Sequence, residues 1–160
     1  MSPLYAWARK FMHPALHHKI IYSMPAGYSG TPLLKKLGIK AGYSLLLLHA
    51  PEHYLELLVE LPEDCQILDK TSAQSADFVH LFCASQEELA IWSTIAKDAI
   101  KKNGMLWVSW PKGKSTIPTD LKRDPIREHF LELGLVDVKV AAVDDDWSGL
   151  KFVYRVKDRA

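Results

Sequence analysis

The chain has 160 residues, and its 20 Lys+Arg against 19 Asp+Glu give a formal net charge of +1. With 48% hydrophobic and 24% charged residues, it has the composition of a globular domain. This excludes a polybasic nucleic-acid coat, an acidic tail and a charge-rich disordered protein. A single domain is expected at this length. The sequence has no apolar run of about 18 residues, so no transmembrane segment is predicted.

The charge is unevenly distributed along the chain. The first 51 residues contain six Lys or Arg and no Asp or Glu. Three of the six lie in residues 1–23, which we interpret as an N-terminal extension of one domain over residues 24–160. The extension lacks the apolar run of a secretory signal. Its histidines (His13, His17 and His18) have no accompanying carboxylate or cysteine, so no metal site is predicted.

The predicted elements begin after a turn-rich joint at Pro25–Gly30. A short helix with Thr31 as its N-cap is expected to end at Gly38. In chain order there follow a buried strand, a helix, two strands and a long helix: 44–49, 51–60, 65–69, 77–83 and 86–102. Asn103-Gly104 is expected to end the long helix.

The remaining elements are a strand over 105–110, a polar loop over 111–120, a helix over 124–133 and two closing strands. Val136, Val138 and Val140 alternate with polar residues, which predicts a strand with one wet face. Because strands alternate with helices, we predict a three-layer Rossmann-like α/β fold. Its mainly parallel sheet ends in an antiparallel hairpin.

Two segments resemble the corresponding parts of S-adenosylmethionine-dependent methyltransferases. They are the lead-in to the first strand, Leu37-Gly-Ile-Lys-Ala-Gly42, and the closing hairpin. The resemblance implies their Rossmann-like fold. Those proteins follow the first strand with a glycine-rich loop that lets the cofactor approach, whereas here His49-Ala50-Pro51 follows. No acidic residue is expected to hold a ribose. The cofactor is therefore unknown, with S-adenosylmethionine disfavoured.

Longer strings resemble a bacterial family, domain of unknown function 3052, over about Gly27 to Tyr154. They include GYSGTPLLKKLGIKAG, ADFVHLF, LWVSWPKGKS and GLVDVKVAAVDDDWSGLKFVYR. The resemblance implies no activity. Because the family's domain begins near Met24, it also implies that residues 1–23 are either an extension peculiar to this chain or an upstream start assigned in error.

Candidate binding residues gather where strands are expected to end. They are Tyr28, Ser29, Gly30 and Thr31 in the polar lead, His49 and His53 after the first strand, Trp110, Lys112 and Lys114 near the polar loop, and Trp147 and Ser148 in the hairpin turn. Structural alternatives stay open: a helix start and a surface residue for the histidines, packing for the tryptophans, and a solvated loop for the lysines. A P-loop is excluded, because Val108 stands where that motif needs glycine.

Four further predictions concern burial. His80 lies between Phe78 and Phe82 on one strand face, which indicates a buried, hydrogen-bonded histidine. Trp107 is expected in the core, and Asp144–Asp146 in a solvated turn. Cys65 and Cys83 are expected as buried, unpaired thiols, which is typical of the reducing cytoplasm.

The function favoured by the sequence is non-catalytic binding of a small ligand or a protein partner. One alternative is a methyltransferase with an atypical cofactor loop, so whether the chain is an enzyme stays open. A second alternative is binding to nucleic acid or an anionic surface through the basic N-terminus. Nucleic acid is the less favoured partner, because only three residues of the extension are Lys or Arg.

Overall fold

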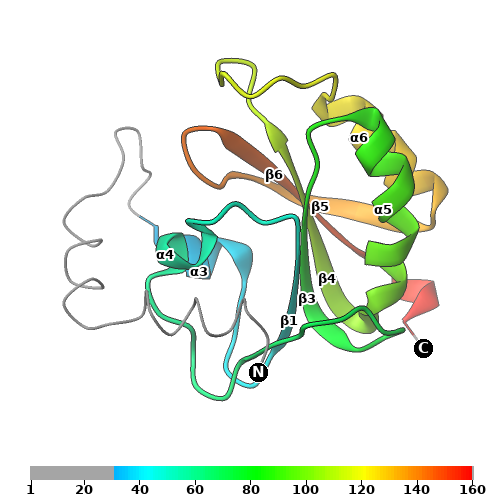
Figure 1. The fold of residues 1–160 in the computed structure, drawn as a ribbon. Coiled ribbons are helices and arrows are strands. Elements are labelled where there is room, and N and C mark those ends of the chain that lie inside the picture. Colours follow the sequence, from blue (N-terminus) through cyan, green and yellow to red (C-terminus); the bar gives the residue numbers. More distant parts are fainter. Residues whose placement is uncertain (1–30, 160) are drawn as a thin grey trace.

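The computed structural model describes residues 31–159. The predicted extension 1–23, its histidines, and the candidate residues Tyr28, Ser29 and Gly30 lie outside this range. Six strands form one sheet in the order β2-β1-β3-β4-β6-β5 (Figure 1). They are β1 (Ser44–Leu48), β2 (Gln66–Ile67), β3 (Ala76–Phe82), β4 (Ile100–Pro111), β5 (Leu135–Ala142) and β6 (Trp147–Tyr154).

The strand directions confirm the predicted fold class. β2, β1, β3 and β4 are mutually parallel, and β6 runs antiparallel to both β4 and β5. Helices α5 (Gln86–Ala99) and α6 (Arg123–Glu132) cover one face, and α3 (Leu33–Leu37) and α4 (Tyr54–Leu58) cover the other (Figure 1). A short 3-10 helix, Val156–Asp158, follows β6. No helix in the described part of the chain is long and apolar enough to cross a bilayer.

The four consecutive leucines of β1 show why the sheet has a core on each side. Leu46 and Leu48 pack beneath the α5 and α6 face, and Leu45 packs beneath the α3 and α4 face. A strand buried on both faces needs an unbroken apolar run, which confirms the interpretation of this segment. Trp107 is fully buried as predicted, and its indole N–H donates to the Leu37 carbonyl at 2.9 Å.

The boundary between α5 and β4 differs from the prediction. The helix ends at Ala99, and the strand begins at Ile100, which pairs with Ala76 of β3. Gly104 therefore lies inside β4, where an added Cβ would sit 2.9 Å from the Asp77 carbonyl oxygen. The pairing with β3 outweighs the helix propensity of the lysines in this segment, since it satisfies the backbone of a buried strand.

Both short helices begin or end differently from the prediction. Pro32, not Thr31, occupies the N-cap of α3, and no side chain caps that helix. The predicted stop at Gly38 is confirmed, with φ 82° and its N–H on the Leu34 and Lys35 carbonyls. α4 is only five residues long, because Val59 adopts a φ of 68° that ends the helix.

The predicted alternation in β5 is wrong at its centre. Asp137 pairs with Phe152 and Lys139 with Lys151, which leaves Val138 as the extra residue of a bulge. Val138 and Val140 are consequently 54% and 53% exposed. A bulge cannot be predicted from alternation alone, because it depends on the register with the neighbouring strand.

Candidate functional site

The strand order reverses next to β1. From β1 the chain moves to β2 on one side and then returns to β3 on the other. Open α/β sheets bind ligands outside the carboxyl ends of strands at such a switch point. The residues that follow β1, β2, β3 and β4 therefore define the candidate site.

His49 makes the turn out of β1. Its φ is 59°, a left-handed conformation that favours glycine. The imidazole packs edge-on against Trp92 of α5, with 4.5 Å between ring centroids, and its Nδ1 lies 3.7 Å from a Glu88 carboxylate oxygen. The side chain is thus directed toward α5, on the side of the sheet away from α4.

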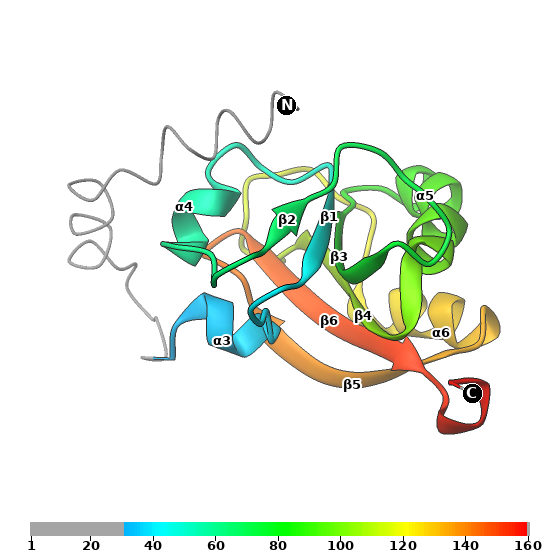
Figure 2. The same ribbon diagram turned by 90° about the horizontal axis from the view of Figure 1, so that it is seen from below.

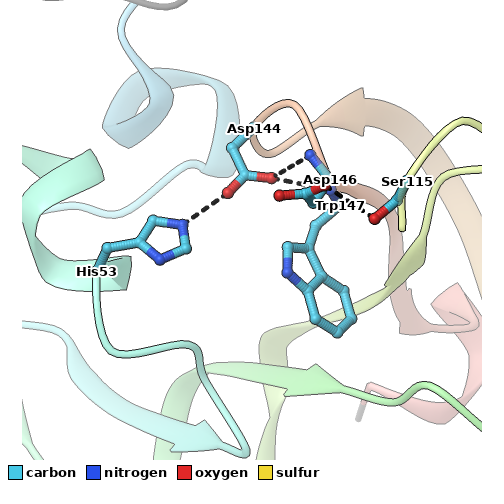
Figure 3. A network of polar contacts seen from close by, with 5 residues as sticks. All are labelled: His53, Ser115, Asp144, Asp146 and Trp147. Atoms are coloured by element: carbon cyan, nitrogen blue, oxygen red, sulfur yellow. Dashed lines mark hydrogen bonds and ion pairs between the residues drawn. The ribbon is translucent and has the colours of Figure 1, made fainter. Parts of the chain in front are cut away.

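His53 lies on the opposite side, at the N-cap of α4. Its Nε2 is 2.7 Å from Oδ2 of Asp144, and Oδ1 of Asp144 accepts the backbone N–H groups of Asp146 and Trp147, each at 2.8 Å (Figure 3). The Ser115 hydroxyl donates to Asp146 at 2.8 Å. These contacts join three segments of the chain: the start of α4, the loop after β4 and the β5–β6 turn.

The Asp144 carboxylate is the centre of this network. Its side chain is only 9% exposed, so the prediction of a solvated turn is wrong for this residue. The two backbone N–H groups in the turn replace the water that a carboxylate would otherwise need. Residues 31–159 contain no group of three or more His, Cys, Asp or Glu placed to hold a metal ion.

We expect Asp144→Ala to lower the free energy of unfolding by about 2 kcal/mol, because two backbone N–H groups lose their acceptor. His53→Gln should cost under about 1 kcal/mol, since the His53 side chain is 46% exposed. Urea unfolding of both variants measures the difference. Equal losses would contradict the central place of Asp144 in the network.

A second polar chain is buried beneath the site. His80 is fully buried, as the sequence predicts, and its two ring nitrogens contact the hydroxyls of Tyr54 at 2.8 Å and Ser109 at 2.7 Å. Burial lowers the pKa of His80 to about 3, so the ring is neutral, and burial also raises the pKa of Tyr54. The hydrogen bonds of His80 to Tyr54 and Ser109 thus link α4 to β3 and β4 through the core.

The structure separates the two candidate tryptophans. Trp110 is 8% exposed and packs in the core beneath α5 and α6, whereas Trp147 packs edge-on against Phe82 on the α4 side, with 5.1 Å between ring centroids. Ser148 lies opposite Trp110 in the β4–β6 pair. The two indoles therefore lie on opposite faces of the sheet.

The candidate lysines and Thr31 lie at the surface. The backbone N–H of Lys112 donates to the Asp146 carbonyl at 2.7 Å, which ties the loop to the hairpin turn. Lys114 is exposed in that loop, and Thr31 is exposed before α3. Both cysteines are free; Cys83 is buried as predicted, but Cys65 is partly exposed at the edge of the sheet.

Sequence reasoning missed Asp69. It follows β2, whose two residues pair in parallel with the start of β1. Its carboxylate is exposed and makes no hydrogen bond or ion pair within residues 31–159. The available signal was spacing, because an acidic residue about 20 positions after the first strand is typical of Rossmann-like ribose sites.

The fold is similar to that of solved S-adenosylmethionine-dependent methyltransferases. One from Aquifex aeolicus has a TM-score of 0.55 and 14% identity, over 85% of this chain and 97% of its own. A TehB-like methyltransferase from Corynebacterium glutamicum has a TM-score of 0.53 and 9% identity, over 95% and 98%. The 1,6-didemethyltoxoflavin-N1-methyltransferase from Burkholderia thailandensis, solved with S-adenosylhomocysteine, has 0.52 and 10%, over 92% and 88%.

No protein-family model matches this sequence. No curated protein matches it either. At these identities the structural neighbours show the fold, which is the methyltransferase-like Rossmann arrangement.

Proposed function

We propose that this chain is an S-adenosylmethionine-dependent methyltransferase with an atypical cofactor turn. The proposal rests on two neighbouring strand exits: the left-handed turn at His49 after β1 and the exposed carboxylate of Asp69 after β2. The matched methyltransferases support it, since they are covered over 88% to 98% of their length. The missing glycines by themselves favour a non-catalytic domain, and the present proposal replaces that interpretation.

The residues present fit part of the cofactor. Asp69 offers a carboxylate to two ribose hydroxyls, the role that acidic residues play at this position in Rossmann-like sites. His49 supplies the left-handed turn without glycine, and its ring is turned toward Trp92 and Glu88 of α5, away from the face that carries α4. When bound, S-adenosylmethionine supplies an electrophilic methyl group.

We assign His53 as the base that accepts a proton from the substrate to be methylated. Asp144 holds its Nε2 and fixes the ring, while the side chain stays 46% exposed. A histidine oriented by a carboxylate can take a proton from a nucleophile through its other nitrogen. The nucleophile would be a hydroxyl, amine or thiol of a small molecule or of a partner protein.

The test is thermal unfolding of the purified protein with increasing S-adenosylmethionine. We expect saturable stabilisation, and Asp69→Asn should weaken the apparent affinity about ten-fold, which corresponds to about 1.4 kcal/mol. Asp64→Asn is the matched control, because Asp64 is another exposed carboxylate, on the loop before β2. Absence of stabilisation in the wild type would refute the proposal, as would equal effects of the two variants.

The second candidate is non-catalytic binding of a small ligand or a protein. The sequence after β1 favours it, because His49-Ala50-Pro51 stands where methyltransferases have a glycine-rich loop. If S-adenosylmethionine does not stabilise the protein, this second candidate becomes the favoured function. Membership in domain of unknown function family 3052 stays a prediction, and the free thiols support a cytoplasmic location.

A further inference from the structure

Two lysines from the β5–β6 hairpin lie near the end of α3. Lys139 of β5 and Lys151 of β6 form a directly opposed cross-strand pair. Lys139 Nζ donates to the Lys36 carbonyl at 2.9 Å, and Lys151 Nζ is 3.9 Å from where a Cβ on Gly38 would lie. Figure 2 shows α3 beside the β5–β6 hairpin that carries both lysines.

The arrangement is electrostatically unfavourable in the unliganded protein. Like charges directly opposite each other in an antiparallel pair destabilise a sheet. Burial lowers the pKa of Lys151, and the positive charges of Lys139 and Lys40 lower it further. Lys40 lies two residues after Gly38, the C-cap of α3, and we count it as the third cation because its charge acts on Lys151.

In the described part of the chain, no acidic side chain forms an ion pair with Lys40, Lys139 or Lys151. Within residues 31–159, neither Lys40 nor Lys151 makes a side-chain hydrogen bond or ion pair, and Lys139 bonds only the Lys36 carbonyl. Residues 1–30 contain no Asp or Glu and cannot supply a side-chain carboxylate. One carbonyl satisfies one of the three donors of an ammonium group, so most of the donors in the cluster remain available to a ligand.

We propose that Lys40, Lys139 and Lys151 form a binding site for a multivalent phosphate, a di- or triphosphate group. Lysine ammoniums are point charges that bind phosphate oxygens without a fixed geometry. Linked phosphoryl groups carry enough negative charge to relieve the repulsion among three lysines. Lys40 precedes β1, whereas His49 and Asp69 follow the ends of β1 and β2, so this site is separate from the proposed methyltransferase site.

The test is a calorimetric titration of the full chain with inorganic tripolyphosphate at two salt concentrations. We expect saturable binding that weakens with salt, and about ten-fold weaker binding by Lys139→Met or Lys151→Met. The matched control is Lys157→Met, which removes the same charge from an exposed position after β6. Absence of saturable binding would overturn the proposal, as would equal weakening by the control.

Stability provides a second readout. Without ligand and at low salt, Lys151→Met should raise the Tm, because it removes a half-buried charge from a repelling cluster. The same variant should lose the rise in Tm that tripolyphosphate gives the wild type. A destabilised variant that still responds fully to tripolyphosphate would overturn the proposal. S-adenosylmethionine stabilisation should be unchanged, so the two proposed sites can fail separately.

Discussion

Replacing His80 with leucine is expected to lower the free energy of unfolding by about 4 kcal/mol. The imidazole bridges the buried hydroxyls of Tyr54 and Ser109 at 2.8 and 2.7 Å. Leucine has about the size of the ring but no polar atom, so both hydroxyls would lose a partner, at about 1–3 kcal/mol each. Urea or thermal unfolding near pH 7 measures the loss.

The triple variant Tyr54→Phe, His80→Leu, Ser109→Ala is the control for this prediction. It removes all three polar groups together, and replacing both partners of a hydrogen bond by apolar groups is much less costly than orphaning one. We therefore expect the triple variant to be more stable than His80→Leu alone. If the triple variant lost as much stability as its three single substitutions summed, the loss in His80→Leu would come from packing and not from unpaired polar groups.

Acid is expected to weaken the native state through the same histidine. Burial lowers the pKa of His80 from 6.5 to about 3, so the unfolded chain binds a proton over a range in which the folded chain does not. Its contribution to stability is fully present above pH 6.5 and is lost as the pH falls toward 3. The loss is about 1.4 kcal/mol per pH unit and approaches about 5 kcal/mol at pH 3.

The reference for this effect is again the triple variant, because it lacks the titrating ring while keeping an apolar core. The unfolding free energy of the wild type minus that of the variant should fall by about 1.4 kcal/mol per pH unit as the pH falls from 6.5. Denaturant unfolding across that range gives the difference directly. A difference that stayed constant would show that protonation of His80 is not linked to unfolding.

The candidate site was only partly predictable from the sequence. Strand ends could be located, so His49 and His53 were found at the exit of the first strand, and the three-dimensional arrangement places them on opposite faces with different partners. Asp69 and Asp144 were missed or misjudged. The role of a carboxylate depends on what lies beside it: the side-chain partner of Asp144 is His53, 91 residues away, and Asp69 follows a strand that pairs with β1.

The sequence by itself determined the elements whose signals are local. The leucine run of β1, the glycine stop of α3 and the alternation of strands and helices require only neighbouring residues to be read. They were sufficient for the fold class, since a buried strand must be covered on both faces.

Tertiary structure alone decided the features that depend on register and pairing. The start of β4 at Ile100 and the bulge at Val138 follow from hydrogen bonds with β3 and β6. The charge asymmetry also changed meaning, because the positive charges of Lys40, from the acid-free first 51 residues, and of Lys139, from the rest of the chain, both act on Lys151. Composition counts charges along the chain, whereas electrostatic energy depends on the distances that folding creates.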